Sequence, residues 1–328
     1  MPAQGPFPFW MKAEPVAANG HHLIFDSFER TRPFDDERYH HNFMGACIAH
    51  EFERDLIEVV PGFDRALANG LKASGRSVLY DDDPTFPYKK SEDYFEWIDL
   101  LTAIERSDSQ FTMIEVGAGY GRWISNAAAA LKRRKKKSTS RVKLVALEAN
   151  KARYELMVKN CAHNEIASSD VKLLRAACTP DGSPVFMICN DDYGASVAKN
   201  ADAMKAFELA NSDVISARDE RGQTFLVEKV PAIRLEELMT ERIDFLDVDI
   251  QGAELDVILS CIDAMDAYVK MAHVGTHSVL VDARLSHLFH LHGWRPRRIF
   301  SCGTVNQTPY GAFQFIDGIQ SWENPRFN

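Results

Sequence analysis

The sequence lacks an excess of basic residues, long apolar runs and a recognisable leader. Its 38 lysines and arginines are outnumbered by 47 acidic residues, which gives a formal net charge of −9. Affinity for nucleic acid phosphates requires a basic face, so nucleic acid is not favoured as a partner. No apolar segment approaches the roughly 20 residues that span a bilayer, and the first ten residues have no basic start followed by an apolar run. We therefore expect a cytoplasmic protein without membrane contact.

Paired cysteines are also missing. The six cysteines are scattered, with no C-x-x-C motif and no Cys/His cluster at zinc spacing. Most of them lie in apolar stretches, so we expect buried free thiols, as in proteins of a reducing compartment. Hydrophobic residues make up 45% of the 328 positions, which is sufficient for a core of normal size.

Residues 1–105 show helical patterns behind an irregular start. Residues 1–20 are rich in Pro, Gly and Ala without periodicity, which indicates an extended arm. Apolar residues recur at three-to-four spacing over 43–57 and again, more briefly, over 63–71, which predicts two helices. Ser91 begins a third helical pattern with one apolar face. We expect this part to form a helical extension that covers a pocket or mediates self-association.

From residue 106 onward, strands alternate with helices, which is typical of an open, mostly parallel sheet with helices on both faces. The chain ends in two strand candidates, 297–302 and 312–316, which we expect to pair as an antiparallel hairpin. A parallel nucleotide-binding sheet with such an end is the architecture of class I methyltransferases. Residues 106–328 are therefore predicted to form one Rossmann-like domain with a seven-stranded sheet. The other predicted strands cover 111–116, 142–147, 171–177, 184–189, 225–230, 245–250 and 269–276, and the predicted helices cover 123–131, 152–161, 253–264 and 281–292.

The strand at 111–116 runs directly into the glycine turn Gly117-Ala118-Gly119-Tyr120-Gly121. A strand that ends in such a turn and leads into a helix brings backbone N–H groups and a positive helix end to one point. Glycine permits the sharp turn and lets ligand atoms touch the backbone. The spacing is G-x-G-x-G, so the dinucleotide fingerprint G-x-G-x-x-G fails at its third glycine. The turn thus predicts a cofactor site and argues against NAD.

Two acidic residues narrow the choice of cofactor. Glu115 lies two residues before the first glycine, where it would be poorly placed beside a pyrophosphate but could hold the ammonium of a methionine moiety. Glu148 follows the second strand, where a carboxylate can accept both ribose hydroxyls. An alternative for Glu148 is that it begins the next helix in a capping arrangement with Asn150. Together with the glycine spacing, Glu115 favours S-adenosylmethionine over NAD.

Three segments carry a resemblance to a known family: MIEVGAGYGRW, VALEANKARYELMVKN and DFLDVDIQGAELDVI. The pattern resembles the FkbM family of methyltransferases over roughly residues 111–300. The resemblance implies a Rossmann-like enzyme that uses S-adenosylmethionine, mostly for O-methylation, with Asp247 or Asp249 near the methyl group and substrate. This sequence departs from commoner members at Gln251-Gly252, where an acid often precedes the glycine, and in its long N-terminal extension. The predicted cofactor-binding residues are Glu115, Gly117, Ala118, Gly119, Tyr120, Gly121, Glu148, Ala149 and Asp247.

Asp247 and Asp249 are two apart on a predicted strand, so we expect both to project to one face. Two carboxylates there repel unless one is protonated, hydrogen-bonded or shared with a cation. They can act as a base with an orienting group, or as a divalent metal site that Glu254 completes. They can also be structural, with Asp249 capping the following helix. We favour the substrate role and predict no metal site.

His273 and His277 are four apart on the next predicted strand, again on one face. A histidine inside a strand is more often a core residue than a catalyst, and we expect this for His273. His277 lies at the strand's end, where open α/β sheets place their ligands. We predict that His277 contacts substrate as a general base, so the predicted catalytic residues are His277, Asp249 and Asp247.

Three other segments are polar or basic. We interpret the basic run at 132–137 as a solvated loop, with binding of an anionic partner as the alternative. The loop at 191–196 is expected to border the cofactor pocket, and residues 88–90 to form a lid over it.

These observations predict an S-adenosylmethionine-dependent methyltransferase that acts on oxygen. The expected acceptor is a small hydroxylated metabolite, a sugar unit or a secondary-metabolite scaffold. One alternative is an NAD-dependent Rossmann oxidoreductase. Another is a non-catalytic interaction module that keeps the fold, in which case the cofactor residues would be dispensable.

Overall fold

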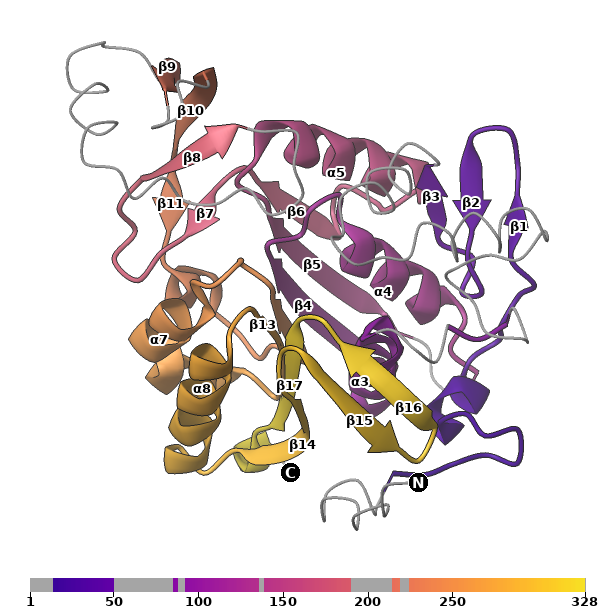
Figure 1. Cartoon of the computed structure of the whole chain (residues 1–328). Helices are drawn as coiled ribbons and strands as arrows, with labels where there is room; N and C mark the ends of the chain where they lie inside the picture. The colour runs from indigo at the N-terminus through magenta and orange to yellow at the C-terminus, as the bar shows by residue number, and fades with distance from the viewer. Residues whose placement is uncertain are drawn as a thin grey trace.

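A seven-stranded sheet forms the centre of the molecule (Figure 1). The structure is a computed structural model that describes residues 14–49, 85–87, 92–135, 139–189, 214–218 and 224–327. In spatial order, the sheet consists of β14 (Arg295–Phe300), β17 (Gly318–Glu323), β13 (Met271–Thr276), β12 (Phe245–Val248), β4 (Gln110–Val116), β5 (Arg141–Leu147) and β6 (Val171–Leu174).

The strands of this sheet are parallel except for β17. Strand β17 runs antiparallel to both of its neighbours, β13 and β14, whereas β12, β13, β4, β5 and β6 pair in parallel. The predicted class I methyltransferase architecture, with its antiparallel end, is therefore confirmed. Strands β4, β12 and β13 are buried almost throughout, as expected for parallel strands that are covered on both faces.

Helices cover both faces of the sheet. One hydrophobic cluster joins the sheet to α3 (Asp93–Arg106), α4 (Arg122–Lys132) and α5 (Lys151–His163). A second cluster joins its other face to η3 (Leu235–Leu238), α7 (Glu254–Tyr268) and α8 (Val279–Leu291). Trp123 belongs to the first cluster and packs edge-on against Trp97. No helix among the described residues combines the length and apolar character needed to cross a bilayer.

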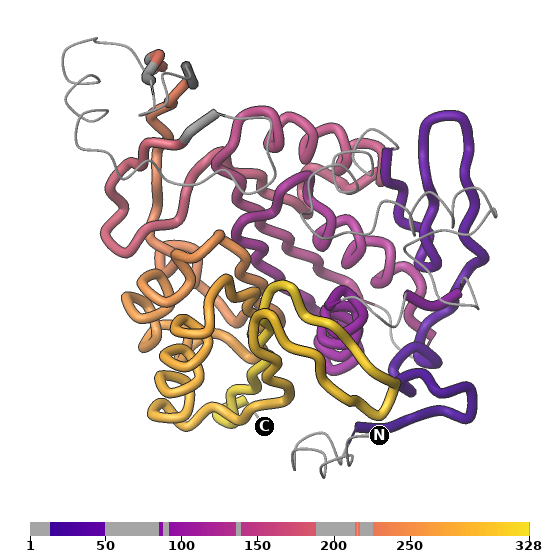
Figure 2. The backbone as a smooth tube through the Cα atoms, in the orientation of Figure 1, coloured from indigo at the N-terminus to yellow at the C-terminus, as the bar shows by residue number. Residues whose placement is uncertain are grey.

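The C-terminal hairpin was predicted with the wrong partner. Strand β16 (Gly311–Phe315) pairs with β15 (Thr304–Thr308), not with β14, and the yellow tube of Figure 2 follows this hairpin. Phe313 and Phe315 of the hairpin belong to the same buried cluster as α3. The partner of β14 is β17. Its residues Gln320 and Ser321 do not resemble a core strand, yet both are buried and donate hydrogen bonds to Asp282 and Asp99.

The helix predicted over 43–57 is wrong where the structure describes it. Residues Cys47–Ala49 form β3, the third strand of a small antiparallel sheet with β2 (Tyr39–His41) and β1 (Phe34–Asp35). The side chain of Asn164, the C-cap residue of α5, fixes the strand, because it accepts from the N–H of Cys47 at 2.7 Å and donates to its carbonyl at 2.8 Å. Such tertiary contacts outweigh local helical spacing. Residues 50–57, the pattern at 63–71 and Ser91 lie outside the described residues, as does the proposed lid at 88–90.

The described part of the basic run, residues 132–135, is partly structural and not only a solvated loop. Arg134 is buried, and its guanidinium donates to the Ser107 carbonyl at 2.9 Å and pairs with Glu105 at 3.2 Å. Lys135 donates to the carbonyl of Asp26 at 2.9 Å, and the N–H of Glu29 donates to the Arg133 carbonyl. The described part of the run therefore ties the N-terminal segment to α3 and α4.

A second small sheet projects from the body in the upper left of Figure 1. It consists of β8 (Val185–Cys189), β10 (Thr224–Val230) and β9 (Val214–Arg218), with β9 unpredicted from sequence. At its base, β7 (Ala177–Cys178) pairs in parallel with β11 (Ala232–Ile233). The loop predicted to border the pocket, 191–196, lies outside the described residues.

Candidate cofactor and acceptor site

The glycine turn lies where β4 ends and α4 begins. Gly117, Gly119 and Gly121 all have positive φ, at 83°, 55° and 72°, a region that L side chains rarely adopt. A Cβ at Gly117 would overlap the main-chain oxygen of Asp249, which follows β12. The turn therefore needs glycine both for its conformation and for close packing against the neighbouring loop.

Backbone N–H groups of the turn are held by the end of β5. The N–H groups of Gly117 and Ala118 donate to the Leu147 carbonyl at 3.0 and 2.8 Å. The N–H of Gly119 donates to Glu148 Oε2, and the N–H of Asn150 donates to Glu148 Oε1, each at 2.7 Å. Burial raises the pKa of Glu148, although these hydrogen bonds oppose the change. Glu148 thus lies against the glycine turn, and its binding of a ribose stays a prediction.

The capping alternative also has a structural counterpart. Asn150 is the N-cap of α5, and its side chain accepts from the N–H of Arg153 at 3.2 Å. Glu148 holds the N–H of this capping residue. The two interpretations of Glu148 are compatible, because a carboxylate has enough lone pairs for both sets of donors.

Glu115 lies beneath the turn and caps α4. Its carboxylate accepts from the N–H groups of Trp123 at 3.2 Å and Ile124 at 2.9 Å. Burial and the nearby carboxylate of Asp247 raise the pKa of Glu115 well above its usual value. A buried acid beside a second buried acid favours the neutral form unless a cation joins them.

A cluster of acids surrounds one histidine on this side of the sheet. His273 on β13 lies 2.9 Å from Asp99 and 3.5 Å from Glu96, measured from its Nδ1 and Nε2. Asp247 and Glu96 offer ligand atoms within 4.8 Å of His273 and of each other. Burial raises the pKa of Asp247 well above its usual value, and the charges of Glu96 and Asp99 add to this effect. Together with Glu115, the cluster holds more carboxylates than cations.

A second histidine lies between two carboxylates at the end of β13. His277 Nδ1 is 2.8 Å from Glu254 Oε1, and its Nε2 is 3.2 Å from Asp249 Oδ1. These two acids raise the pKa of His277 to about 10, against the effect of its burial. Glu254 is fully buried, whereas the Asp249 side chain is 50% exposed. The three residues could also ligate a divalent cation, but the ion pairs already engage both ring nitrogens.

The structure separates Asp247 from Asp249. We expected both carboxylates on one face, but β12 ends at Val248, so strand alternation does not extend to Asp249. Asp247 belongs to the buried cluster around His273, and Asp249 pairs with His277. The predicted catalytic residues are therefore neighbours that lie in two different environments.

Sequence reasoning missed the contribution of α3. Glu96 and Asp99 face the sheet from this helix, whose other inward residues are almost all apolar. An acid in the middle of an apolar helix face was the available signal, since buried acids are rarely left without a partner. Asp317, between β16 and β17, was also missed, and its charge acts on His277, Asp249 and Glu254.

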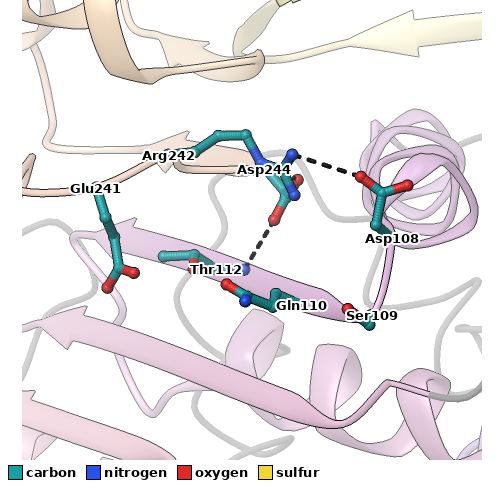
Figure 3. A pocket seen from close by; sticks show the side chains of 7 residues that line it. All are labelled: Asp108, Ser109, Gln110, Thr112, Glu241, Arg242 and Asp244. Atoms are coloured by element: carbon teal, nitrogen blue, oxygen red, sulfur yellow. Dashed lines mark hydrogen bonds and ion pairs between the residues drawn. The ribbon is translucent and has the colours of Figure 1, made fainter.

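A polar hollow of about 400 Å³ lies at the opposite edge of the sheet (Figure 3). There Asp244 accepts from the N–H of Thr112 at 3.0 Å, and Arg242 reaches Asp108 at 3.5 Å. This edge holds the amino ends of β4 and β12, whereas ligands of open α/β sheets bind at the carboxyl ends. We therefore place the functional site at the glycine turn and not in this hollow.

A family model matches the central part of the chain. The model of the methyltransferase FkbM domain matches residues 115–278, half of the chain, from Glu115 to one residue past His277. The chain belongs to the FkbM methyltransferase family. The matched region contains all the predicted cofactor and catalytic residues.

Individual related proteins share little sequence identity with this chain. A protein of Jannaschia sp. (strain CCS1), named "Putative methyltransferase", is 27% identical over 240 residues, covering 71% of this FkbM family member and 79% of the relative. Among solved structures, the FkbM methyltransferase of Methylobacillus flagellatus KT is 10% identical with a TM-score of 0.38, over 66% of this chain and 44% of that one. An rRNA methylase of Streptococcus thermophilus is also 10% identical, with a TM-score of 0.40 over 72% and 98%.

Proposed function

We propose that this family member uses S-adenosylmethionine to methylate a hydroxyl oxygen of a small metabolite, a sugar unit or a secondary-metabolite scaffold. The excess of buried carboxylates beside the glycine turn is the observation that carries the choice of cofactor. Burial and neighbouring carboxylates favour the neutral forms of Glu115 and Asp247, and a cation relieves this cost. S-adenosylmethionine brings a sulfonium and an ammonium, whereas the diphosphate of NAD would be repelled.

The residues that would hold this cofactor are the predicted ones. The glycine turn 117–121 would lie against it, Glu148 would accept ribose hydroxyls, and Asp247 with Glu115 would face its ammonium. S-adenosylmethionine supplies an electrophilic methyl group when bound. The protein's task is then to align the acceptor oxygen, exclude water and take a proton.

His277 is the proposed proton acceptor, with Asp249 as the group that orients the acceptor hydroxyl. His277 is protonated at neutral pH, because its neighbouring acids raise its pKa to about 10. A positive charge brought close to Asp249 disfavours the imidazolium and releases the base. The contacts that Arg134 and Lys135 make within the protein and the negative net charge support a small-molecule acceptor over a nucleic acid. The division at residue 105 and self-association through the N-terminal region stay predictions.

Isothermal titration calorimetry with S-adenosylhomocysteine and NAD tests the cofactor. We expect the first to bind and the second not to. The Gly117→Ala variant should weaken binding at least about tenfold, because its Cβ would displace the Asp249 loop. Gly293→Ala is a matched control, since Gly293 also has positive φ (75°) but its added Cβ would meet nothing. Because Gly117→Ala can fail to fold, Glu148→Ala serves as a second variant. Tight NAD binding without S-adenosylhomocysteine binding would overturn the proposal.

A further inference from the structure

Glu254, the first residue of α7, is fully buried although it carries a charge. One of its oxygens, Oε1, accepts from the N–H of Gly252 at 2.8 Å and of Ile250 at 3.3 Å. The same oxygen lies 2.8 Å from Nδ1 of His277. The other oxygen, Oε2, is buried without a hydrogen-bond partner among the described residues. Burying a carboxylate in this way is costly.

An electrostatic role at the helix start does not explain this burial. Acids near a helix N-terminus act favourably on its dipole from the surface too, and Asp256 in the same first turn is exposed. The N-cap of α7 is Ala253, and no side chain caps the helix. Glu254 instead points to the two groups that it binds, the preceding turn and the imidazole of His277.

The preceding turn is itself strained. Gln251 and Gly252 have φ of 55° and 97°, and a left-handed conformation costs a residue other than glycine about 1 kcal/mol or more. Oε1 of Glu254 accepts N–H groups on both sides of Gln251. The turn directly follows Asp249, so a single oxygen fixes both the loop that carries Asp249 and the ring that faces it.

We propose that Glu254 is the positioning residue of the acceptor site: it holds Nδ1–H of His277, so that Nε2 alone exchanges a proton with the acceptor. This inference rests on the proposed function. The acceptor O–H bond breaks, and its proton binds Nε2. The oxygen then forms the new bond to the methyl carbon, while the electron pair of the broken carbon–sulfur bond stays on sulfur. The charged groups that face His277 are Asp249 after β12, Glu254 on α7 and Asp317 between β16 and β17.

Nitrogen-15 NMR of histidine-labelled protein tests this role, with His277→Gln to assign the signal. Above about pH 10, where the wild-type ring is neutral, it should carry its proton on Nδ1. In Glu254→Gln the amide oxygen still accepts from Nδ1–H, so the tautomer should persist while the pKa of His277 falls by roughly one to three pH units. In Glu254→Ala both tautomers should appear. Asp256→Asn is the matched control, because it removes a charge from the same helix turn without contacting His277.

Two outcomes contradict the inference. One is a neutral His277 with its proton on Nε2 in the wild type, a measurement that needs no variant to fold. The other is an equal effect of Glu254→Gln and Asp256→Asn on the His277 titration. Calorimetry with S-adenosylhomocysteine on the same samples separates the two proposals. If it binds but the His277 signal is unchanged by Glu254→Gln, only the inference fails, whereas absence of binding to the wild type overturns the proposed function.

Discussion

Two histidines four residues apart, His273 on β13 and His277 directly after it, have similar neighbours but different surroundings. The inner cluster is centred on His273, between Asp99 and Glu96, and the outer cluster on His277, between Glu254 and Asp249. In both, two carboxylates raise the pKa of the imidazole to about 10. The inner histidine is fully buried, whereas 14% of the outer side chain is exposed.

The two clusters differ in what the carboxylates beside each histidine contact in turn. In the inner cluster Asp99 also accepts from Arg298 and Ser321, and Arg298 pairs in turn with Glu14 at 2.8 Å. This closed network joins α3, β14, β17 and the N-terminal segment, and it holds the pKa of Asp99 below its usual range. In the outer cluster the chain of partners ends at the half-exposed Asp249. A ligand can therefore approach His277 from the exposed side of Asp249, whereas His273 is enclosed by protein groups.

Removing a carboxylate from each cluster should give the largest contrast. Asp99→Asn leaves buried cations without their counter-charge, so we expect the free energy of unfolding to fall by about 3–5 kcal/mol. Asp249→Asn removes a half-exposed partner and should cost about 1 kcal/mol or less. Urea unfolding at neutral pH measures both. Equal losses of stability in Asp99→Asn and Asp249→Asn would contradict the distinction between a closed inner network and an open outer one.

The pH dependence of stability should separate the clusters next. Both histidines have a raised pKa in the folded protein, so their stabilising effect is complete below the unfolded value of 6.5. It declines as the pH rises through about 10. Stability should therefore fall between pH 7 and 10, on the order of a few kcal/mol in all. His277→Gln should remove the part of this pH-dependent stability that comes from His277 and leave the part that comes from His273. A wild-type stability that is flat over this range would contradict the shared protonation.

The smallest expected effect concerns the space beneath Asp249. A Cβ at Gly275 would lie 3.3 Å from Asp249 Cγ, so Gly275→Ala should shift that carboxylate by a few tenths of an ångström. Gly275 has no positive φ, and stability should change by less than about 1 kcal/mol. We expect the pKa of His277 to fall slightly, by less than about one pH unit, and that of His273 to stay constant. Histidine NMR titration would show both, and a shift of His273 instead would refute the separation of the clusters.

The arrangement of the glycine turn and its two neighbouring acids was predictable because its signals are local. The strand, the glycine spacing and the acids at 115 and 148 are contiguous patterns with fixed structural meaning, and the structure brings them together. The inner cluster was not predictable, since its members come from residues 14, 96, 99, 273 and 298. No spacing rule relates an acid on one helix to an arginine two hundred residues later.

The errors in the fold have the same origin. Strand β3 follows a helical spacing locally, but it forms because Asn164 binds its backbone. In β17, Gln320 and Ser321 are polar residues, and both can be buried because they donate hydrogen bonds to Asp282 and Asp99. Hydrophobic periodicity predicts structure where a segment packs its apolar side chains against a core. These segments are instead held by hydrogen bonds to individual polar groups, which periodicity does not detect.

The contact between Gly117 and Asp249 has a consequence for engineering this family. The N–H of Asp249 donates to the Val116 carbonyl at 2.9 Å, and Gly117 leaves no room for even a methyl group against the Asp249 carbonyl. Segments 116–121 and 249–252 therefore pack directly against each other and form one rigid unit. Chimeras that exchange acceptor loops between relatives should carry both segments from the same parent, and libraries should diversify them jointly.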